Sequence, residues 1–546
     1  MAYIDTAAPA AALDSAHIGD IEGAFGTIRA QDTGHAQDTG ARSPWRRRIV
    51  TLLAVIGPGV IVMTGDNDAG AYATYTQAGQ TYGATLLWTL VLLIPVLYVC
   101  QEMVARLGAV TGVGHARLIF ERFGRFWGAF SVIDLFLLNG LTIVTEFIGI
   151  SLAMDYFGVS KLLGVVVAGV LVVAAASTGS FRRFERFALV LCLGSFVVVP
   201  IFIVAHPAVG QMARGLVLPL MPQGKLSDIM LLIIGIVGTT VAPWQLFFQQ
   251  SYVVDKRLAP RFIRYEKADM WIGVGITQIG AVAMLAFAAA IFAGTPEFGN
   301  FTDAGGVAAG LAKHVGAWAG DLFAIGLIDA AILGAAAVGL STAYAFGDVL
   351  SLHHSLHRKP TDAWGFYLVY GGIVAVAAVI VLIPGSPLGL LTEAVQVLAG
   401  VLLPSATVFL LLLCNDRAVL GPWVNGRRQN LLAGVIVAVL LVLSLVLTLS
   451  VLFPDITDRQ ILWVIGAGSA LSVIAFGVTR LLSARAPRAA EAALDRATWR
   501  MPALDRLAPA RLSVGTRVWM AALRFYLVAA CVAVIVRVVQ ITLFQG

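Results

Sequence analysis

Residues 57–74 read GPGVIVMTGDNDAGAYAT, and this stretch decides how the chain folds. It lies inside an apolar run, 49–82, that is long enough to cross a membrane, yet it carries glycine, proline and two aspartates at its centre. Backbone groups freed by a helix break in lipid have no water to bond, and an intramembrane acid is costly. A run of this kind is therefore expected to unwind around Asp66 and Asp68 and to line a site.

The composition places the whole chain in a membrane. Of its 546 residues, 59% are hydrophobic and 12% are charged, with a mean hydropathy of +0.87. The charged fraction is about half the ~25% of soluble domains. Soluble globular proteins are excluded, and with them cytosolic enzymes and nucleic-acid binders. The four cysteines lie in apolar runs without a CxxC pair, which argues against a disulfide framework or a zinc site.

Twelve apolar runs follow one another along the chain, each close to the ~20 residues that span a hydrocarbon layer. They cover 49–82, 84–105, 127–154, 162–178, 187–205, 227–254, 268–293, 320–347, 364–384, 388–414, 431–453 and 460–482. A thirteenth run, 518–544, carries Arg524 and Arg537, so it either crosses the membrane or lies as an amphipathic helix in the interface.

The distribution of basic residues predicts the topology. Cytoplasmic loops hold an excess of Lys and Arg. With the N-terminus inside, the inside segments hold 30 of the 37 Lys and Arg, and the outside loops hold only Lys161, Arg214, Lys225, Lys313 and Arg459. We therefore expect a multi-pass protein of the plasma or inner membrane with a cytoplasmic N-terminus. The same excess accounts for the net charge of +6 without a nucleic-acid partner.

Five segments follow from this division. Residues 1–45 are rich in Ala, Gly, Asp and Thr and are expected to be a disordered cytoplasmic tail. Residues 46–414 form a ten-helix core, 415–482 add helices eleven and twelve, 483–517 form an Arg-rich cytoplasmic segment, and 518–546 hold an extra apolar helix.

A second interrupted run matches the first. Residues 238–245, GTTVAPWQ, break the sixth run, five spans after the first break. Two broken helices at matching positions of two five-helix halves indicate an inverted-repeat transporter with its site at the bilayer midplane. The predicted fold class is an all-α integral membrane protein with a LeuT-type 5+5 inverted repeat, discontinuous helices 1 and 6, and two or three extra C-terminal helices.

The polar groups at the first break point to a hard cation. Carboxylate, amide and carbonyl oxygens suit Mg²⁺, Mn²⁺ or Ca²⁺, whereas later transition metals prefer sulfur or imidazole. Asp68 is the principal candidate ligand, with Asp66 and Asn67 as secondary ones. All eight histidines lie outside the twelve runs, and Met63 is the one sulfur close to this break in sequence.

These motifs resemble those of the NRAMP divalent-metal transporters. Further matches, in order, are QEMVARLGAVTG (101–112), Glu146 in TEFIG, FRRFER (181–186), TTVAPW (239–244), AIGL and GLST in the eighth run, and LLCNDRAVLGPWVN (412–425). Together they cover residues 49–455. The resemblance implies a metal-transport site at the two breaks, with backbone oxygen near Ala71 and Ala242 helping Asp68. The resemblance also brings Glu146 and Gln396 near the site or the pathway. Thr239 and Thr240 either offer hydroxyl or carbonyl oxygen or bond back to their own helix, and Trp244 either closes the cavity or fills space.

The chain departs from that family at the ligands. Ala71 stands where the family has a metal-ligating asparagine, and Ala242 and Trp244 replace the methionine and histidine of its Met-Pro-His. This pattern is similar to the NRAMP-related magnesium transporters. A pocket with small side chains and oxygen ligands lets an ion keep several waters, which suits Mg²⁺ because it dehydrates reluctantly.

Proton coupling is expected to be weak or absent. Gln249 replaces a second family histidine and Ile143 replaces an aspartate, so Asp68 and Glu146 are the acids that remain. The membrane potential then supplies the driving force together with the metal gradient, at ~2.3 kcal/mol per charge per 100 mV.

The sequence therefore predicts a secondary transporter of Mg²⁺ and Mn²⁺, with no enzymatic activity and no resident cofactor. Its partners are the divalent cation and the lipid bilayer; the oligomeric state stays open, and a monomer fits. The alternatives are a proton-coupled Mn²⁺/Fe²⁺ transporter and a Na⁺-coupled symporter of amino acids or amines with the same fold. An intramembrane aspartyl protease would need Gly-x-Gly-Asp, and Met63 breaks that motif.

Overall fold

The computed structural model describes residues 14–29, 44–385, 388–453, 455–485 and 499–510, together with residue 496 and scattered positions between 517 and 536. Its helices in the first half are α1 (Pro44–Val55), α2 (Pro58–Thr64), α3 (Ala69–Tyr82), α4 (Leu87–Thr111), α5 (His115–Phe123), α6 (Arg125–Tyr156), α7 (Lys161–Ala176), α8 (Phe181–Gly194), α9 (Val198–Ala205) and α10 (Val209–Val217). The second half holds α11 (Leu226–Thr240), α12 (Pro243–Asp255), α13 (Ile263–Phe292), α14 (Ala304–His314), α15 (Ala317–Leu350), α16 (Trp364–Val381), α17 (Leu388–Cys414), α18 (Arg417–Leu420), α19 (Arg427–Leu452) and α20 (Asp458–Arg485). Two strands, β1 (Ile21–Gly23) and β2 (Gly26–Ile28), and short 3₁₀ turns complete the described part.

The predicted all-helical membrane architecture is confirmed. Within the described residues, nine helical segments are long and apolar enough to cross a membrane, and Lys161–Ala176 is a shorter apolar helix. Each of the twelve apolar runs coincides with helix, the first as α1 to α3 and the twelfth as α20. Most of run 518–544 lies outside the described residues, so its placement stays a prediction.

Helix-breaking residues set the ends of the interrupted helices. Gly57 has a φ of 149°, a conformation open to glycine, and Pro58 then starts α2. Asp68 is the N-cap of α3, and Pro243 is the first residue of α12. Both predicted breaks are therefore real, and each has its cause in the local sequence.

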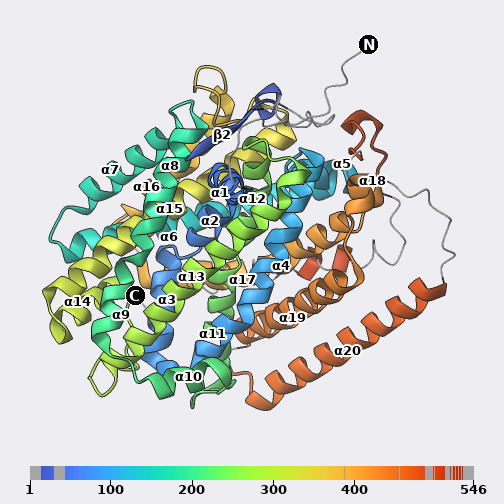
Figure 1. Ribbon diagram of the computed structural model, residues 1–546. Helices are drawn as coiled ribbons and strands as arrows, with labels where there is room; N and C mark the ends of the chain where they lie inside the picture. The colour runs from blue at the N-terminus through green and yellow to red at the C-terminus, as the bar shows by residue number, and fades with distance from the viewer. Residues whose placement is uncertain are drawn as a thin grey trace, which may run out of the picture.

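The broken helices lie inside the bundle. Figure 1 shows α2, α3, α11 and α12 among the other helices, while α20 runs along the edge of the molecule beside α19. Helix α13 packs along both α2 and α3, α6 packs against α15, and α11 packs against α17. The two breaks thus lie within a scaffold of longer helices.

The N-terminal segment 14–29 is ordered, which corrects the expected disordered tail. Strands β1 and β2 pair antiparallel, with Ile21 opposite Ile28. At the turn, the Ala24 N–H donates to Glu185 Oε2 at 2.6 Å. Asp14, which N-caps a 3₁₀ turn, pairs with Arg358 at 2.5 Å. These partners are supplied by distant loops and helices, so the local composition did not reveal them. Of the rest of the predicted tail, Pro44 and Trp45 begin α1, and the other residues lie outside the described part.

A buried charged cluster holds the start of α2 in place. Lys256 and Glu185 are both fully buried and pair at 2.6 Å, and Lys256 also donates to the Ile56 carbonyl at 2.7 Å. Asp269 of α13 accepts from the N–H groups of Gly57 at 3.1 Å and Gly59 at 2.6 Å. The carboxylate of Asp269 therefore satisfies donors at the N-terminus of α2 that have no partner within the helix.

Removing the ammonium group of Lys256 is expected to destabilise the fold. Lys256→Met leaves the buried Glu185 carboxylate unpaired, which costs about 3–5 kcal/mol. The melting temperature of the purified protein should fall clearly. Lys313→Met is the matched control: Lys313 pairs with Glu297 but its side chain is 62% exposed, so this change should leave the melting temperature nearly unchanged. Equal melting of both variants would contradict the assignment.

Candidate functional site

Asp68 lies at the start of α3 and is buried, with 3% of its surface exposed. Its Oδ1 accepts from the Ala71 N–H at 2.8 Å, so the carboxylate caps the helix. Acids are favourable at this position because the helix N-terminus is partly positive. Ala71 therefore offers Asp68 its N–H from the first turn of α3. This differs from the expected carbonyl near Ala71, since a helix start directs N–H groups toward the break.

Glu146 of α6 reaches the same helix start. Its Oε2 accepts from the Ala69 N–H at 3.1 Å, and its carboxyl group lies next to that of Asp68. Glu146 is fully buried, and apart from the neighbouring Asp68 carboxyl its Oε1 has no hydrogen-bond partner among the described residues. Gly334 permits this packing, because a Cβ there would lie 2.7 Å from the Glu146 carboxyl carbon. Two acids from separate helices thus meet at the first break.

Asp66 faces the second broken helix. Its Oδ1 accepts a hydrogen bond from Gln245 of α12, while its Oδ2 has no partner among the described residues. Gln245 in turn accepts from Gln101 of α4 at 3.0 Å. Neither glutamine is among the predicted site residues. Gln245 stands next to the predicted Trp244, and Gln101 lies in a quoted motif, so buried amides in apolar runs were the available signal.

The side chain of Asn67, a secondary candidate ligand, points toward α13. Its Nδ2 donates to the Thr277 carbonyl of α13 at 3.0 Å, and it packs against Gly280, where a Cβ would lie 2.4 Å from that nitrogen. The side-chain amide therefore joins the first break to α13 by a hydrogen bond. Its Oδ1 has no partner among the described residues.

The second break consists of Val241 and Ala242, between the end of α11 and the start of α12. At this break a backbone carbonyl loses the N–H donor that a continuous helix would provide. Pro243 has no N–H, so the Thr239 carbonyl lacks the bond that a continuous helix would give it. The Thr239 hydroxyl also has no partner among the described residues. Thr240, in contrast, bonds its own helix and lies 2.7 Å from the Tyr75 hydroxyl of α3. Thr240 therefore links the two broken helices instead of offering a ligand.

Trp244 and Gln396 contact the breaks directly. The Trp244 ring lies against Gly65, where a Cβ would be 3.5 Å from it, and the indole is almost fully buried. Gln396 of α17 lies against Gly70, where a Cβ would be 1.7 Å from its Nε2. Its backbone carbonyl meets Gly238. Gln396 thus touches the polypeptide at both breaks.

Buried polar atoms without partners gather at this junction. Within the described part of the chain they include Asp66 Oδ2, Glu146 Oε1, Thr239 Oγ1 and Gln396 Nε2. Buried polar groups are normally hydrogen-bonded, so each exception calls for a reason. Most of these atoms are oxygens. No group of three or more His, Cys, Asp or Glu that would hold a metal ion occurs in the described residues. A cation here therefore needs amide, hydroxyl or carbonyl oxygen, or water, beside the acids.

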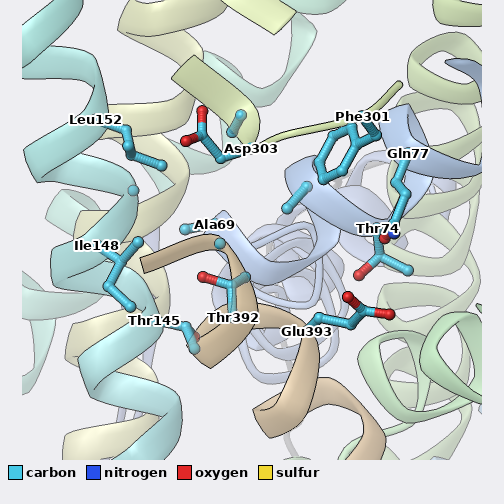
Figure 2. A pocket seen from close by; sticks show the side chains of 14 residues that line it. Ala69, Thr74, Gln77, Thr145, Ile148, Leu152, Phe301, Asp303, Thr392 and Glu393 are labelled. Atoms are coloured by element: carbon cyan, nitrogen blue, oxygen red, sulfur yellow. The ribbon is translucent and has the colours of Figure 1, made fainter. Parts of the chain in front are cut away.

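A cleft lies beside the first break, and Figure 2 shows the side chains that line it. It lies between α3, α6 and α17, with Ala69 and Thr145 near the site and Asp303 and Glu393 farther out along the wall. Its space measures about 370 Å³, including the part open to solvent. Carboxylates along such a cleft raise the local concentration of cations.

Comparisons of the sequence with known proteins agree with this geometry. The family model for natural resistance-associated macrophage protein-like (Nramp) proteins matches residues 59–450. A divalent metal cation transporter MntH of Ralstonia nicotianae is 30% identical over 421 residues, which is 73% of this chain and 92% of that protein. The MntH of Latilactobacillus sakei is 27% identical over 422 residues, 73% of this chain and 90% of its own.

Solved structures share the fold. The crystal structure of a manganese transporter of Eremococcus coleocola matches with a TM-score of 0.62 at 21% identity, covering 80% of this chain and 94% of that one. At this identity the likeness shows the fold alone, and it confirms the predicted broken-helix, inverted-repeat class.

The contact at Gly238 gives a test of the junction. A Cβ at Gly238 would lie 2.3 Å from the Gln396 carbonyl and 2.6 Å from the Gly400 nitrogen, both backbone atoms. Gly238→Ala must therefore push α11 away from α17, and we expect a loss of about 1–3 kcal/mol, measured as a lower melting temperature. Gly235→Ala, one turn earlier, meets only Thr74 Cγ2 at 3.8 Å and should be tolerated. An equal response of both variants would contradict the close packing at the break.

Proposed function

The chain belongs to the Nramp family, and on that premise we propose that it carries divalent metal cations across a membrane by alternating access. The cation rests at the junction of the two broken helices, with Asp68 as its principal ligand. Asp66, Glu146 and the backbone oxygen near Ala242 assist. The proteins named divalent metal cation transporters among its relatives support this substrate class.

The observation that carries the proposal is the convergence of buried acids and unbonded polar atoms at the two breaks. Asp66, Asp68 and Glu146 are each at most 3% exposed, yet no Lys or Arg of the described residues forms an ion pair with them. Uncompensated carboxylates inside a membrane protein are costly. A divalent cation would compensate two of these charges and bond the orphaned oxygens.

The chemistry of the ligands favours Mg²⁺ and Mn²⁺. Ala242 brings no sulfur to the second break. Met63, the sulfur nearest the first break in sequence, packs toward α13: a Cβ on Gly273 would lie 2.8 Å from its Cβ and 2.9 Å from its Cγ. Oxygen ligands and water remain, and these suit hard cations that keep part of their hydration. Solved structures of a manganese transporter with this fold add support for Mn²⁺.

Entry and exit follow from the cleft and the basic loops. The cleft with Asp303 and Glu393 is the proposed entrance from outside the cell. The ordered N-terminal segment contacts Arg186, Arg257 and Arg358, so it shares one side of the molecule with these basic loops. That side is the proposed cytoplasmic one, in a plasma or inner membrane.

Replacing the principal ligand tests the proposal. In liposomes that contain the purified protein, Asp68→Ala should lower Mn²⁺ and Mg²⁺ uptake by about 100-fold or more, because a carboxylate ligand is lost. Asp155→Ala is the control, since Asp155 forms an exposed pair with Lys161 at the end of α6; its flux should match the unaltered protein. Equal flux with Asp68→Ala would remove Asp68 from the mechanism.

The ion preference rests on Ala242 and has its own test. Ala242→Met adds a thioether at the second break, and soft ligands favour later transition metals over Mg²⁺. The ratio of Mn²⁺ to Mg²⁺ uptake should rise by about 10-fold. Ala259→Met, which adds the same sulfur in the loop before α13, should leave the ratio unchanged. An unaltered ratio with Ala242→Met would contradict a cation at this break.

Coupling to protons is proposed to be weak or absent, because Gln249 and Ile143 occupy two positions where the family has a histidine and an aspartate. Mn²⁺ uptake into liposomes should then increase with an inside-negative potential and leave the internal pH unchanged. A pH-sensitive dye trapped inside provides the measurement. Metal-driven acidification at zero potential would refute the proposal.

A further inference from the structure

We propose that a second, weaker cation site lies on the other side of the breaks, in the cavity between α5, α6, α12 and α17, with Asp134 as its carboxylate. The inference rests on the proposed transport of divalent cations. The cavity is narrow, with room for about one water-sized sphere between its walls. Its wall is mainly apolar, formed by Ile119, Leu135, Leu138, Phe247 and Phe409.

The polar groups of this cavity lack partners. Asp134 lines the cavity, is partly exposed, and forms no hydrogen bond or ion pair with the described residues. Ser131, one turn earlier on α6, is 6% exposed, and its Oγ has no partner in the described chain. Residues three apart on a helix share a face. Ser405 of α17, 5% exposed, lines the same cavity. A carboxylate and hydroxyls on an apolar wall form a set of hard-cation ligands.

Arg524 of the C-terminal segment is a described positive charge near Asp134, and it lies on the aromatic rings one to two turns earlier on α6. The two side chains are not paired, because Arg524 is held on aromatic rings at the start of α6. Its guanidinium carbon lies 3.7 Å from the centre of the Trp127 ring, 3.9 Å from Phe126 and 4.1 Å from Phe130. Its Nη2 donates to the Phe126 carbonyl at 3.3 Å. Cation–π contacts fix the guanidinium there.

The positive charge of Arg524 lowers the affinity of the Asp134 site for a cation. A salt bridge would neutralise Asp134, whereas a nearby unpaired guanidinium leaves the carboxylate available and repels a bound cation at longer range. A cation held there would leave easily, which suits a place of release. Arg524 also lies beyond residues 59–450, the part that the family model matches.

The position of the cavity fits a release path. Pro243 and Phe247 of α12 line it, so it begins directly after the second break. The cleft of Figure 2 approaches the first break along α3, whereas α12 runs from the second break to the basic loop at Lys256. An ion that leaves the junction toward the basic side would therefore pass Asp134.

Binding of Mn²⁺ to the purified full chain, followed by electron paramagnetic resonance of the free ion, tests the inference. Asp68→Asn removes the principal ligand, and the variant should keep one weak Mn²⁺ site. Asp68→Asn with Asp134→Asn should weaken that site by at least about 10-fold. Asp68→Asn with Arg524→Gln should tighten it by about 3- to 10-fold, because the repulsion is removed.

Asp329→Asn combined with Asp68→Asn is the matched control. Asp329 is another acid within a helix, α15, and lies against Gly194 of α8, away from this cavity. Its loss should leave the weak site unchanged. If the Asp134 variant melts early, Ser131→Val gives the same test with the acid intact and should also weaken binding.

The outcomes separate the two proposals. Wild-type affinity in Asp68→Asn would overturn the principal site. Loss of the tight site, with the weak site unaltered by Asp134→Asn or Arg524→Gln, would overturn only this inference.

Discussion

A backbone N–H or carbonyl inside a membrane has no water to bond, and this constraint shapes the centre of the molecule. Two helices are interrupted inside the membrane-spanning region. Their freed N–H and carbonyl groups must therefore find partners within the protein. At the first break, Asp68 and Glu146 accept from N–H groups of α3. At the second break, Pro243 leaves the Thr239 carbonyl without a helical donor. The proposed cation site uses the oxygen atoms that these two breaks leave at the junction.

The same carboxylates serve structure and function. Asp68 caps α3 and is also the proposed principal ligand, so a cation bound there would share the carboxylate that holds the start of the helix. Glu146 lies beside it on a separate helix, α6, and Asp66 bonds Gln245 on α12. Movement of α6 or α12 relative to α3 would therefore change the set of oxygens around an ion. That link is what alternating access at a fixed site requires.

A second group of buried charges stabilises the opposite end of the first broken helix. Asp269 binds the N-terminus of α2, and the Lys256–Glu185 pair joins the loop after α12 to α8. The hairpin of residues 21–28 adds the Ala24 N–H to the same Glu185. The short helix α2 is thus fixed by charges at one end and unwound at the other. Its stability depends on partners from four other parts of the chain.

The sequence alone determined the class of the fold and the location of the breaks. Hydropathy marks the membrane spans, and Gly57 and Pro243 interrupt helices locally. Freed backbone groups and acids are costly in lipid, so such interruptions indicate a site. The sequence also predicted Asp68 and Glu146 as site residues, and the structure brings both carboxyl groups to the start of α3. Only the tertiary structure decided that Asn67 binds α13, that Thr240 bonds Tyr75, and that residues 14–29 are ordered. Those outcomes depend on side chains tens or hundreds of residues away, and neither periodicity nor composition records which of them become neighbours.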